Sequence, residues 1–187
     1  HAGYDAKEGS LMAKYNVEGN AMYEALCKEV DAPFRRVGSY VLAFSEKEKE
    51  HLEMLYKRGI ANGVPEMEII DAAEIQRREP HVSKEAVAAL YAGTAGITGP
   101  WEFAIKLVEN AMENGVELKL NAEVENIKKI DDSFEIKLKS GEIIKTKKVI
   151  NAAGVYADFI NNMLSNKKFK ITPRIGEYYL LDKVQGY

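Results

Sequence analysis

The sequence has few of the features that would stabilise a chain without a packed core or attach it to a polyanion. Its 187 residues include a single cysteine, Cys27, so an internal disulfide and a Cys/His zinc site are both excluded. The 26 basic and 29 acidic side chains give a net charge of −3, which offers no overall attraction to nucleic acid. The longest uncharged stretch, residues 86–101, contains three glycines and a proline and is too short to cross a bilayer. We expect a globular protein in a reducing, intracellular setting, with no transmembrane segment and no nucleic-acid partner.

Apolar residues recur at helical spacing through the first 115 positions, and two short apolar runs lie between them. The spacing predicts helices over residues 11–30, 45–61, 71–79 and 100–114. Two of these begin with the spacing of a capping box, Ser45 with Glu48 and Asp71 with Glu74. The apolar runs, residues 37–44 and 86–91, predict two buried strands, with a glycine-containing loop over residues 93–99.

The apolar period changes from 3.6 to two after residue 115. Apolar and charged residues alternate over residues 116–120, 124–130 and 134–138, with turn residues at 131–132 and 140–141, which predicts a β-meander. A strand over 149–154, a helix over 155–164 and an extended segment over 169–181 are expected to follow. This order predicts an α+β (mixed α/β) fold, in which the chain passes twice through a second domain.

The stretch with the clearest chemical meaning is residues 149–158, VINAAGVYAD. A strand that ends in Ala-Ala-Gly and turns into a helix lets a bulky ligand approach the backbone, and the start of the helix can face a phosphate. Tight packing of strand against helix without a ligand explains the same residues equally well.

Four segments in order carry a family resemblance: residues 1–26 (HAGYDAKEGSLMAKYNVEGNAMYEAL), 95–124 (AGITGPWEFAIKLVENAMENGVELKLNAEV), 149–160 (VINAAGVYADFI) and 172–183 (TPRIGEYYLLDK). The chain resembles the FAD-dependent oxidoreductases that include D-amino acid oxidase and glycine oxidase, and lies closest to the glycerol-3-phosphate dehydrogenase-like members. The resemblance implies a substrate domain, built on an antiparallel sheet with helices, over residues 1–93 and 166–187. Residues 94–165 would form the middle of a Rossmann-like FAD-binding domain with its β-meander.

The sequence departs from the family pattern in two respects. The family's GxGxxG turn and the final strand and helix of its flavin site are absent. Because the chain also opens at His1, we expect a central piece of a longer protein that does not hold FAD by itself. The family's Ser-Pro-Tyr-Glu reads Gly99-Pro100-Trp101-Glu102 here, so a hydroxyl-specific role at that loop is not supported.

The resemblance also implies which residues contact cofactor and substrate. The backbone of Val124 would lie beside the adenine, and Asn151, Ala152, Ala153 and Gly154 near the ADP half of FAD. Asp158 follows this turn and is expected to support its helix rather than to bind ligand. Considered alone, Val124 would be a core residue.

Three further residues are candidates at the substrate. His1 matches the family's histidine near the flavin ring, where an imidazole could take a hydroxyl proton; the alternative is a solvated terminal residue. Arg174 would pair with an anionic substrate, or simply with Glu177. Tyr178 and Tyr179 alternate across the last extended segment, so at most one of them faces a cavity, and Tyr178 is the candidate. Tyr40 is a weaker candidate of the same kind. Neither His51 nor His81 belongs to a metal-ligand motif in the sequence, and both are expected at the surface.

The resulting hypothesis is a fragment of an FAD-dependent dehydrogenase that oxidises sn-glycerol 3-phosphate to dihydroxyacetone phosphate by hydride transfer to the flavin. Its partners would be a small anionic substrate and a quinone or electron carrier, in the cytoplasm or bound peripherally at the inner face of the membrane. The first alternative is an L-2-hydroxyglutarate or amino acid oxidase of the same family. Others are a non-catalytic binding module that keeps the fold, and a flavoprotein subunit active only in a complex.

Overall fold

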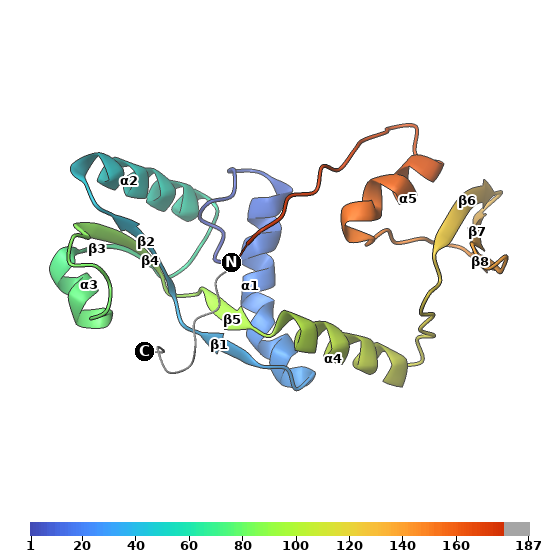
Figure 1. The fold of residues 1–187 in the computed structure, drawn as a ribbon, viewed down its shortest axis with the longest axis horizontal. Coiled ribbons are helices and arrows are strands. Elements are labelled where there is room, and N and C mark those ends of the chain that lie inside the picture. The colour runs from blue at the N-terminus through green and yellow to red at the C-terminus, as the bar shows by residue number, and fades with distance from the viewer. Residues whose placement is uncertain (178–187) are drawn as a thin grey trace. The chain divides into compact units, whose positions relative to one another are not determined.

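The computed structural model describes residues 1–177. The chain divides into two compact units, His1–Val116 and Glu117–Tyr187. The elements of the first unit are α1 (Leu11–Glu29), β1 (Phe34–Arg36), β2 (Ser39–Ala43), α2 (Glu46–Ala61), β3 (Met67–Asp71), α3 (Ala72–Arg78), β4 (Ala88–Ala92), β5 (Gly96–Thr98) and α4 (Pro100–Glu113) (Figure 1). Those of the second are β6 (Val124–Ile130), β7 (Ser133–Leu138), β8 (Ile143–Thr146), a 3₁₀ turn (Gly154–Tyr156) and α5 (Ala157–Leu164).

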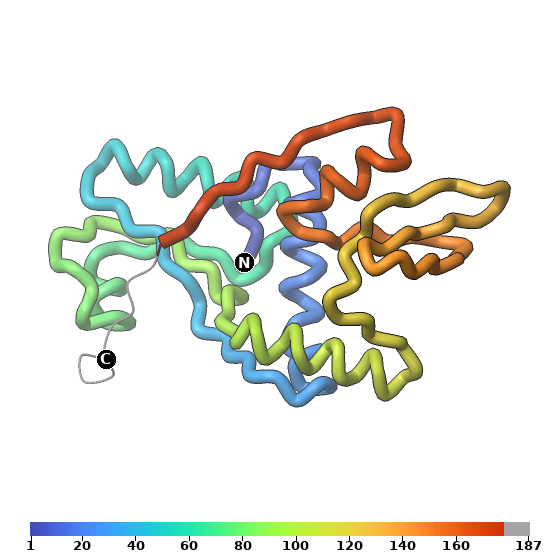
Figure 2. The backbone as a smooth tube through the Cα atoms, turned by 45° about the vertical axis from the view of Figure 1, so that its right-hand side comes forward, coloured from blue at the N-terminus to red at the C-terminus, as the bar shows by residue number. Residues whose placement is uncertain are grey.

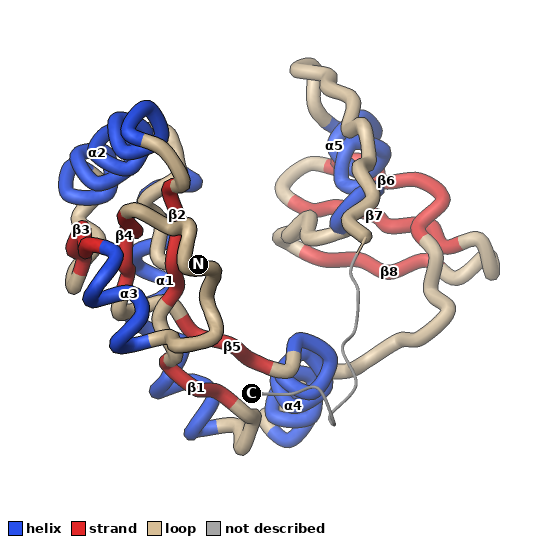
Figure 3. The backbone as a smooth tube through the Cα atoms, turned by 60° about the vertical axis from the view of Figure 1, so that its left-hand side comes forward, coloured by secondary structure: helices blue, strands red, loops and turns tan. Residues whose placement is uncertain are grey.

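The first unit is organised around an antiparallel sheet with the strand order β2-β4-β3. Side chains alternate across the central strand, so Leu90 joins a core with Leu52 of α2, while Ala89 joins another with Ile75 of α3. Helices α2 and α3 therefore cover opposite faces of the sheet (Figure 3). This confirms the predicted antiparallel sheet with helices.

The helix starts follow the predicted caps, with one difference. Ser45 Oγ accepts from the backbone N–H of Glu48 at 3.3 Å, and Asp71 Oδ1 accepts from that of Glu74 at 2.9 Å. The reciprocal half of the capping box differs: Glu48 Oε2 accepts from the N–H of Phe44, one residue earlier than expected. The Glu74 carboxylate pairs with two arginines of its own helix.

Two structural features of the first unit differ from expectation. Part of the loop expected over residues 93–99 is strand β5, which pairs with β1 through Phe34 and Thr98, and β3 was not anticipated at all. Both β1 and β5 have three residues, too few to show a period, and their pairing joins positions 60 to 64 residues apart.

The second unit contains the predicted meander, in the order β6-β7-β8 (Figure 2). Ile127 and Leu138 are buried in it, and α5 packs against β6. Two predicted extended segments, over residues 116–120 and 149–154, are not strands, and neither is the described part, residues 169–177, of the segment predicted over 169–181. A strand needs a neighbour for its N–H and C=O groups, and within residues 117–177 only the meander strands are paired. Among the described helices, none is long and apolar enough to span a membrane.

Candidate functional site

A cavity of about 540 Å³ lies in the first unit beside His1. Its walls come from residues 1–5, one face of α1, Phe34 of β1, and residues 95–98, which include β5. This is the size range of a small-ligand site. The histidine selected from the sequence therefore borders a cavity, and the unforeseen strand pair β1–β5 forms part of its wall.

Two glycines allow the backbone to close around this cavity. A Cβ at Gly38 would lie 2.4 Å from the ring of Tyr91, and the residue has φ of +71°, so only glycine fits without strain. A Cβ at Gly96 would lie 2.7 Å from the ring of Phe34. A side chain at either position would force neighbouring rings out of place.

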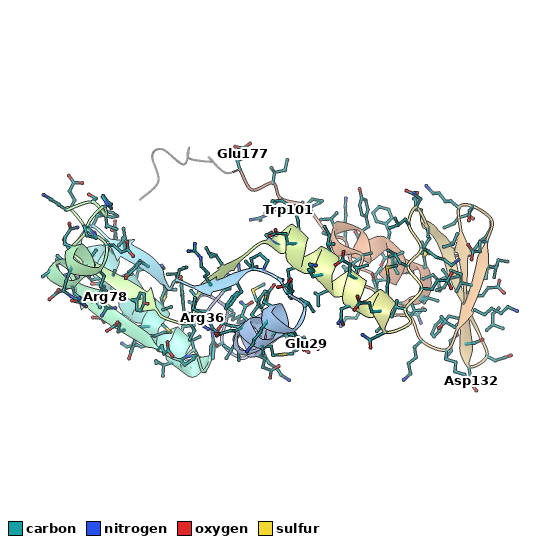
Figure 4. The ribbon with its side chains drawn as sticks, turned by 90° about the horizontal axis from the view of Figure 1, so that it is seen from below. Glu29, Arg36, Arg78, Trp101, Asp132 and Glu177 are labelled. Atoms are coloured by element: carbon teal, nitrogen blue, oxygen red, sulfur yellow. The ribbon has the colours of Figure 1, made fainter. Side chains whose placement is uncertain are left out.

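An asparagine that the sequence did not single out holds the segment carrying His1. Asn20, on α1, donates from Nδ2 to the carbonyl of His1 at 3.0 Å and to that of Thr94 at 2.9 Å. Arg36, seen beside α1 in Figure 4, donates to Asn20 Oδ1 at 2.9 Å. These partners are separated by between 16 and 74 positions, so no local pattern could have identified them.

The small-residue turn lies in the second unit, immediately before the 3₁₀ turn and α5. Asn151 stabilises it: its Nδ2 donates to the carbonyl of Ala157 at 2.7 Å, and its Oδ1 accepts from the N–H of Ala153 at 3.3 Å. Residues 151–154 are all exposed, and Gly154 has φ of +56° with open space around its Cβ position. The turn thus presents backbone and methyl groups to solvent, and within residues 151–154 no large side chain would keep a ligand from the backbone.

Val124 and Asp158 both have structural roles in the second unit. Val124 begins β6 beside a bulge that shifts the register between Val124 and Asn126, and it is half-buried. Asp158 is only 6% exposed; its Oδ1 accepts from the N–H of Phe159, and its Oδ2 accepts from that of Ile171 at 2.9 Å. Asp158 therefore fastens the chain after α5 to the first turn of that helix, as expected of a supporting residue.

The remaining candidates are dispersed. Arg174 is exposed in a segment without helix or strand, and Tyr178 lies outside the described residues. The ring of Tyr40 packs at a tilt against that of Tyr91, with centroids 4.9 Å apart, and burial raises the pKa of the Tyr40 hydroxyl. His51 is exposed on α2.

Of the sequence-predicted residues, the structure groups Asn151, Ala152, Ala153 and Gly154 in one turn of the second unit. His1 lies in the first unit, His1–Val116.

The whole chain, residues 1–187, matches the DAO family, described as FAD dependent oxidoreductase. The chain belongs to this family. It is 52% identical over 186 residues to a glycerol 3-phosphate dehydrogenase of Caloramator mitchellensis, covering 100% of this chain and 38% of the relative. It is 29% identical over 199 residues to the mitochondrial L-2-hydroxyglutarate dehydrogenase of Mus musculus, covering 100% of this chain and 42% of the relative.

A solved structure has the same fold. The dithionite-reduced L-alpha-glycerophosphate oxidase from Mycoplasma pneumoniae, with FAD bound, superimposes with a TM-score of 0.77 at 32% identity. The match covers 87% of this chain and 44% of that one. The chain thus spans less than half the length of these relatives.

Proposed function

We propose that the polypeptide containing this chain is an FAD-dependent dehydrogenase that oxidises sn-glycerol 3-phosphate to dihydroxyacetone phosphate. The observation that carries this proposal is the 52% identity, along the whole chain, to a glycerol 3-phosphate dehydrogenase. Residues 1–93 and 166–187 would belong to the substrate domain, and residues 94–165 to the FAD domain. Because the chain covers 38% of that relative, the remaining parts of both domains would come from the rest of the polypeptide.

The cofactor would be held in part by the turn before α5. The exposed backbone of Asn151, Ala152, Ala153 and Gly154 would contact the ADP half of FAD, and the start of β6 at Val124 would lie beside the adenine. The support for this assignment is the exposed surface of the turn. Within residues 151–154, no side chain larger than that of Asn151 stands between the backbone and a bound cofactor. The fragment alone is expected to be inactive.

His1 is the proposed proton acceptor. Oxidation of a secondary alcohol to a ketone removes a hydride from carbon and a proton from oxygen, and FAD, when bound, supplies the hydride acceptor. An imidazole titrates near neutral pH, so the side chain of His1 can take the proton from the substrate hydroxyl. Its place at the cavity wall supports this role.

Arg174 and Tyr178 are the proposed contacts to the anionic end of the substrate. A guanidinium presents paired donors that match a phosphate or a carboxylate, and the side chain of Arg174 is exposed and available to ligand. The proposed electron acceptor is a quinone or another electron carrier. With a quinone dissolved in the bilayer, the enzyme would work in the cytoplasm at the inner face of the membrane.

The test is the visible spectrum of the purified full-length polypeptide, titrated with glycerol 3-phosphate in the absence of oxygen. Flavin absorption that bleaches on addition is the expected result. Reoxidation by a quinone analogue but not by dissolved oxygen would further support a dehydrogenase, and rapid reoxidation by oxygen would make it an oxidase. A colourless protein that FAD cannot reconstitute would contradict the proposal and favour a non-catalytic module.

L-2-Hydroxyglutarate is the second candidate substrate, because relatives with that activity match the chain along its full length. In the same titration, flavin that ignores glycerol 3-phosphate but is bleached by L-2-hydroxyglutarate would favour this assignment.

A further inference from the structure

Two asparagine amides hold the segment of residues 1–6 against the rest of the first unit. Asn62, which caps the C-terminus of α2, donates from Nδ2 to the carbonyls of Gly3 at 2.9 Å and Ala6 at 2.8 Å. Asn20 does the same for the carbonyls of His1 and Thr94. A primary amide has two N–H donors, and both asparagines use both of theirs on backbone carbonyls. The segment carrying His1 is thus held near both ends, although it forms no helix or strand.

Arg36 determines which way the Asn20 amide faces. A guanidinium can only donate, so the group that Arg36 Nη1 contacts on Asn20 must be the carbonyl oxygen, and the amide N–H groups must then face His1 and Thr94. Arg36 also donates from Nη2 to the backbone carbonyl of Asn20 at 3.1 Å and from Nη1 to the carbonyl of Thr94. Glu24 accepts from Arg36 Nε at 3.2 Å.

Asn20, Arg36 and Glu24 form a hydrogen-bonded network, in which the ion pair between Arg36 and Glu24 adds little to the stability of the fold. The Arg36 side chain is 29% exposed and that of Glu24 is 70% exposed, and exposed ion pairs of this kind contribute little to folding. Asn20 itself lines the cavity beside His1, as do the residues that directly follow Thr94. The network therefore fixes the positions of His1, at the cavity wall, and of Thr94 more than it stabilises the fold.

We propose that Asn20 is a positioning residue for His1, with Arg36 holding the Asn20 amide in the orientation this requires. The inference rests on the proposed function, in which His1 takes the hydroxyl proton of the substrate. A displacement of about 1 Å in a reacting group can lower a rate about 100-fold. His1 lies in a segment without helix or strand, and the Asn20 amide donates to its backbone carbonyl, so a change at Asn20 acts directly on the position of His1.

The experiment measures the rate constant of flavin reduction by saturating glycerol 3-phosphate, in single-turnover mode without oxygen, on the full-length FAD-loaded protein. We expect Asn20→Ala to lower the rate about 10- to 100-fold, with the FAD content and the half-saturating substrate concentration changed less than about threefold. Arg36→Ala leaves Asn20 in place, so it should lower the rate constant of flavin reduction less, by about 3- to 10-fold. Asn114→Ala is the matched control, because Asn114 is exposed and its Nδ2 donates to a carbonyl of its own helix, that of Asn110; it should leave the rate unchanged.

A double-mutant cycle with His1→Ala separates positioning from general structural damage. If Asn20 acts through His1, Asn20→Ala has no further effect on the rate once His1→Ala is present. An equal loss in both backgrounds would overturn the proposal, as would a wild-type rate in Asn20→Ala. Asn20→Asp keeps the side-chain volume but removes both donors, and we expect it to reproduce the loss. If Asn20→Ala and Asn20→Asp both fail to retain FAD, the residue serves folding and the proposal is wrong.

The two proposals can fail separately. A wild-type flavin that glycerol 3-phosphate leaves oxidised contradicts the proposed substrate only, and the same cycle is then run with L-2-hydroxyglutarate. A wild-type flavin that neither compound reduces overturns both proposals.

Discussion

Arg78 shows how a single residue of the first unit ties an element to its neighbours. Arg78, labelled in Figure 4, donates to Glu74 of its own helix α3 and to Glu68 of β3, both at 2.5 Å. Its guanidinium lies over the ring of Tyr91 at 5.1 Å. Glu74 also accepts from Arg77 Nη2 at 2.6 Å. Hydrogen bonds from the two arginines, with Arg77 making the larger contribution and Arg78 the smaller, lower the pKa of the Glu74 carboxyl to about 2.

This pKa predicts an acid-dependent effect of Glu74→Gln. The folded-state pKa is below the ordinary value of 4.5, so the carboxylate stabilises the folded state above about pH 4.5 and loses that effect as the pH falls toward 2. We expect wild type to have a higher melting temperature than Glu74→Gln at neutral pH, and the difference to narrow as the pH falls from about 5 to about 2. Because the Glu74 and Arg78 side chains are both partly exposed, the difference should be small and should shrink further in high salt.

Glu85→Gln is the control for this comparison, because it removes an exposed carboxylate from the loop before β4. A melting-temperature difference that stays constant from neutral pH to about pH 2 would contradict the ion-pair explanation of the Glu74 effect.

At the scale of the elements, the stability of helix α2 comes from both its N-cap and its buried face. Ser45 satisfies the free N–H of Glu48, and the helix then buries Leu52 and Leu55 against the β2-β4-β3 sheet. Its C-cap, Asn62, is also the residue that fastens the segment of residues 1–6. Loosening α2 would therefore affect the cavity beside His1 as well as the core.

Ser45→Ala should destabilise the full-length protein by about 1 kcal/mol, because the N–H of Glu48 loses its side-chain acceptor. Ser45→Gly is the matched comparison and should cost only a few tenths of a kcal/mol, about what glycine costs at an N-cap. Urea unfolding monitored by circular dichroism measures both. Equal stabilities of Ser45→Ala and wild type would show that the cap adds nothing here, leaving the buried face of α2 as its source of stability.

At the scale of the whole molecule, the proposed flavin contacts can be tested without disturbing a core. Ala152 is exposed in the turn before α5, so Ala152→Phe should leave the fold intact while its ring occupies the surface proposed for the ADP half of FAD. We expect the full-length variant to retain less than about a tenth of the wild-type FAD, a loss of at least about 1.4 kcal/mol in binding. Flavin absorbance per protein after gel filtration measures this.

Lys148→Phe serves as the comparison, because it places the same ring at an exposed position a few residues before the turn. It should keep its FAD. Full FAD content in Ala152→Phe would show that the turn does not contact the cofactor, and loss in both variants would point to a general effect of an exposed ring.

How much could be predicted depends on how far the responsible contacts extend along the chain. The helix over residues 11–30, the caps at Ser45 and Asp71 and the meander were predictable, because 3.6-residue and two-residue periods and capping are local. The predicted strand over residues 149–154 was wrong: its apolar pattern is present, but within the described residues it has no paired neighbour. The division into residues 1–93, 94–165 and 166–187 stays a prediction.

The sequence by itself determined the mixed α/β class and the membership in the FAD-dependent oxidoreductase family, because four ordered segments carry that resemblance along the whole chain. It also pointed to His1 and to the turn at residues 151–154. Only the tertiary structure decided that β1 pairs with β5, that a cavity opens beside His1, and that Asn20 joins His1 to Thr94. The physical reason is that a hydrogen bond between residues 19 or 74 positions apart leaves no period and no motif, and exists only once the chain has folded.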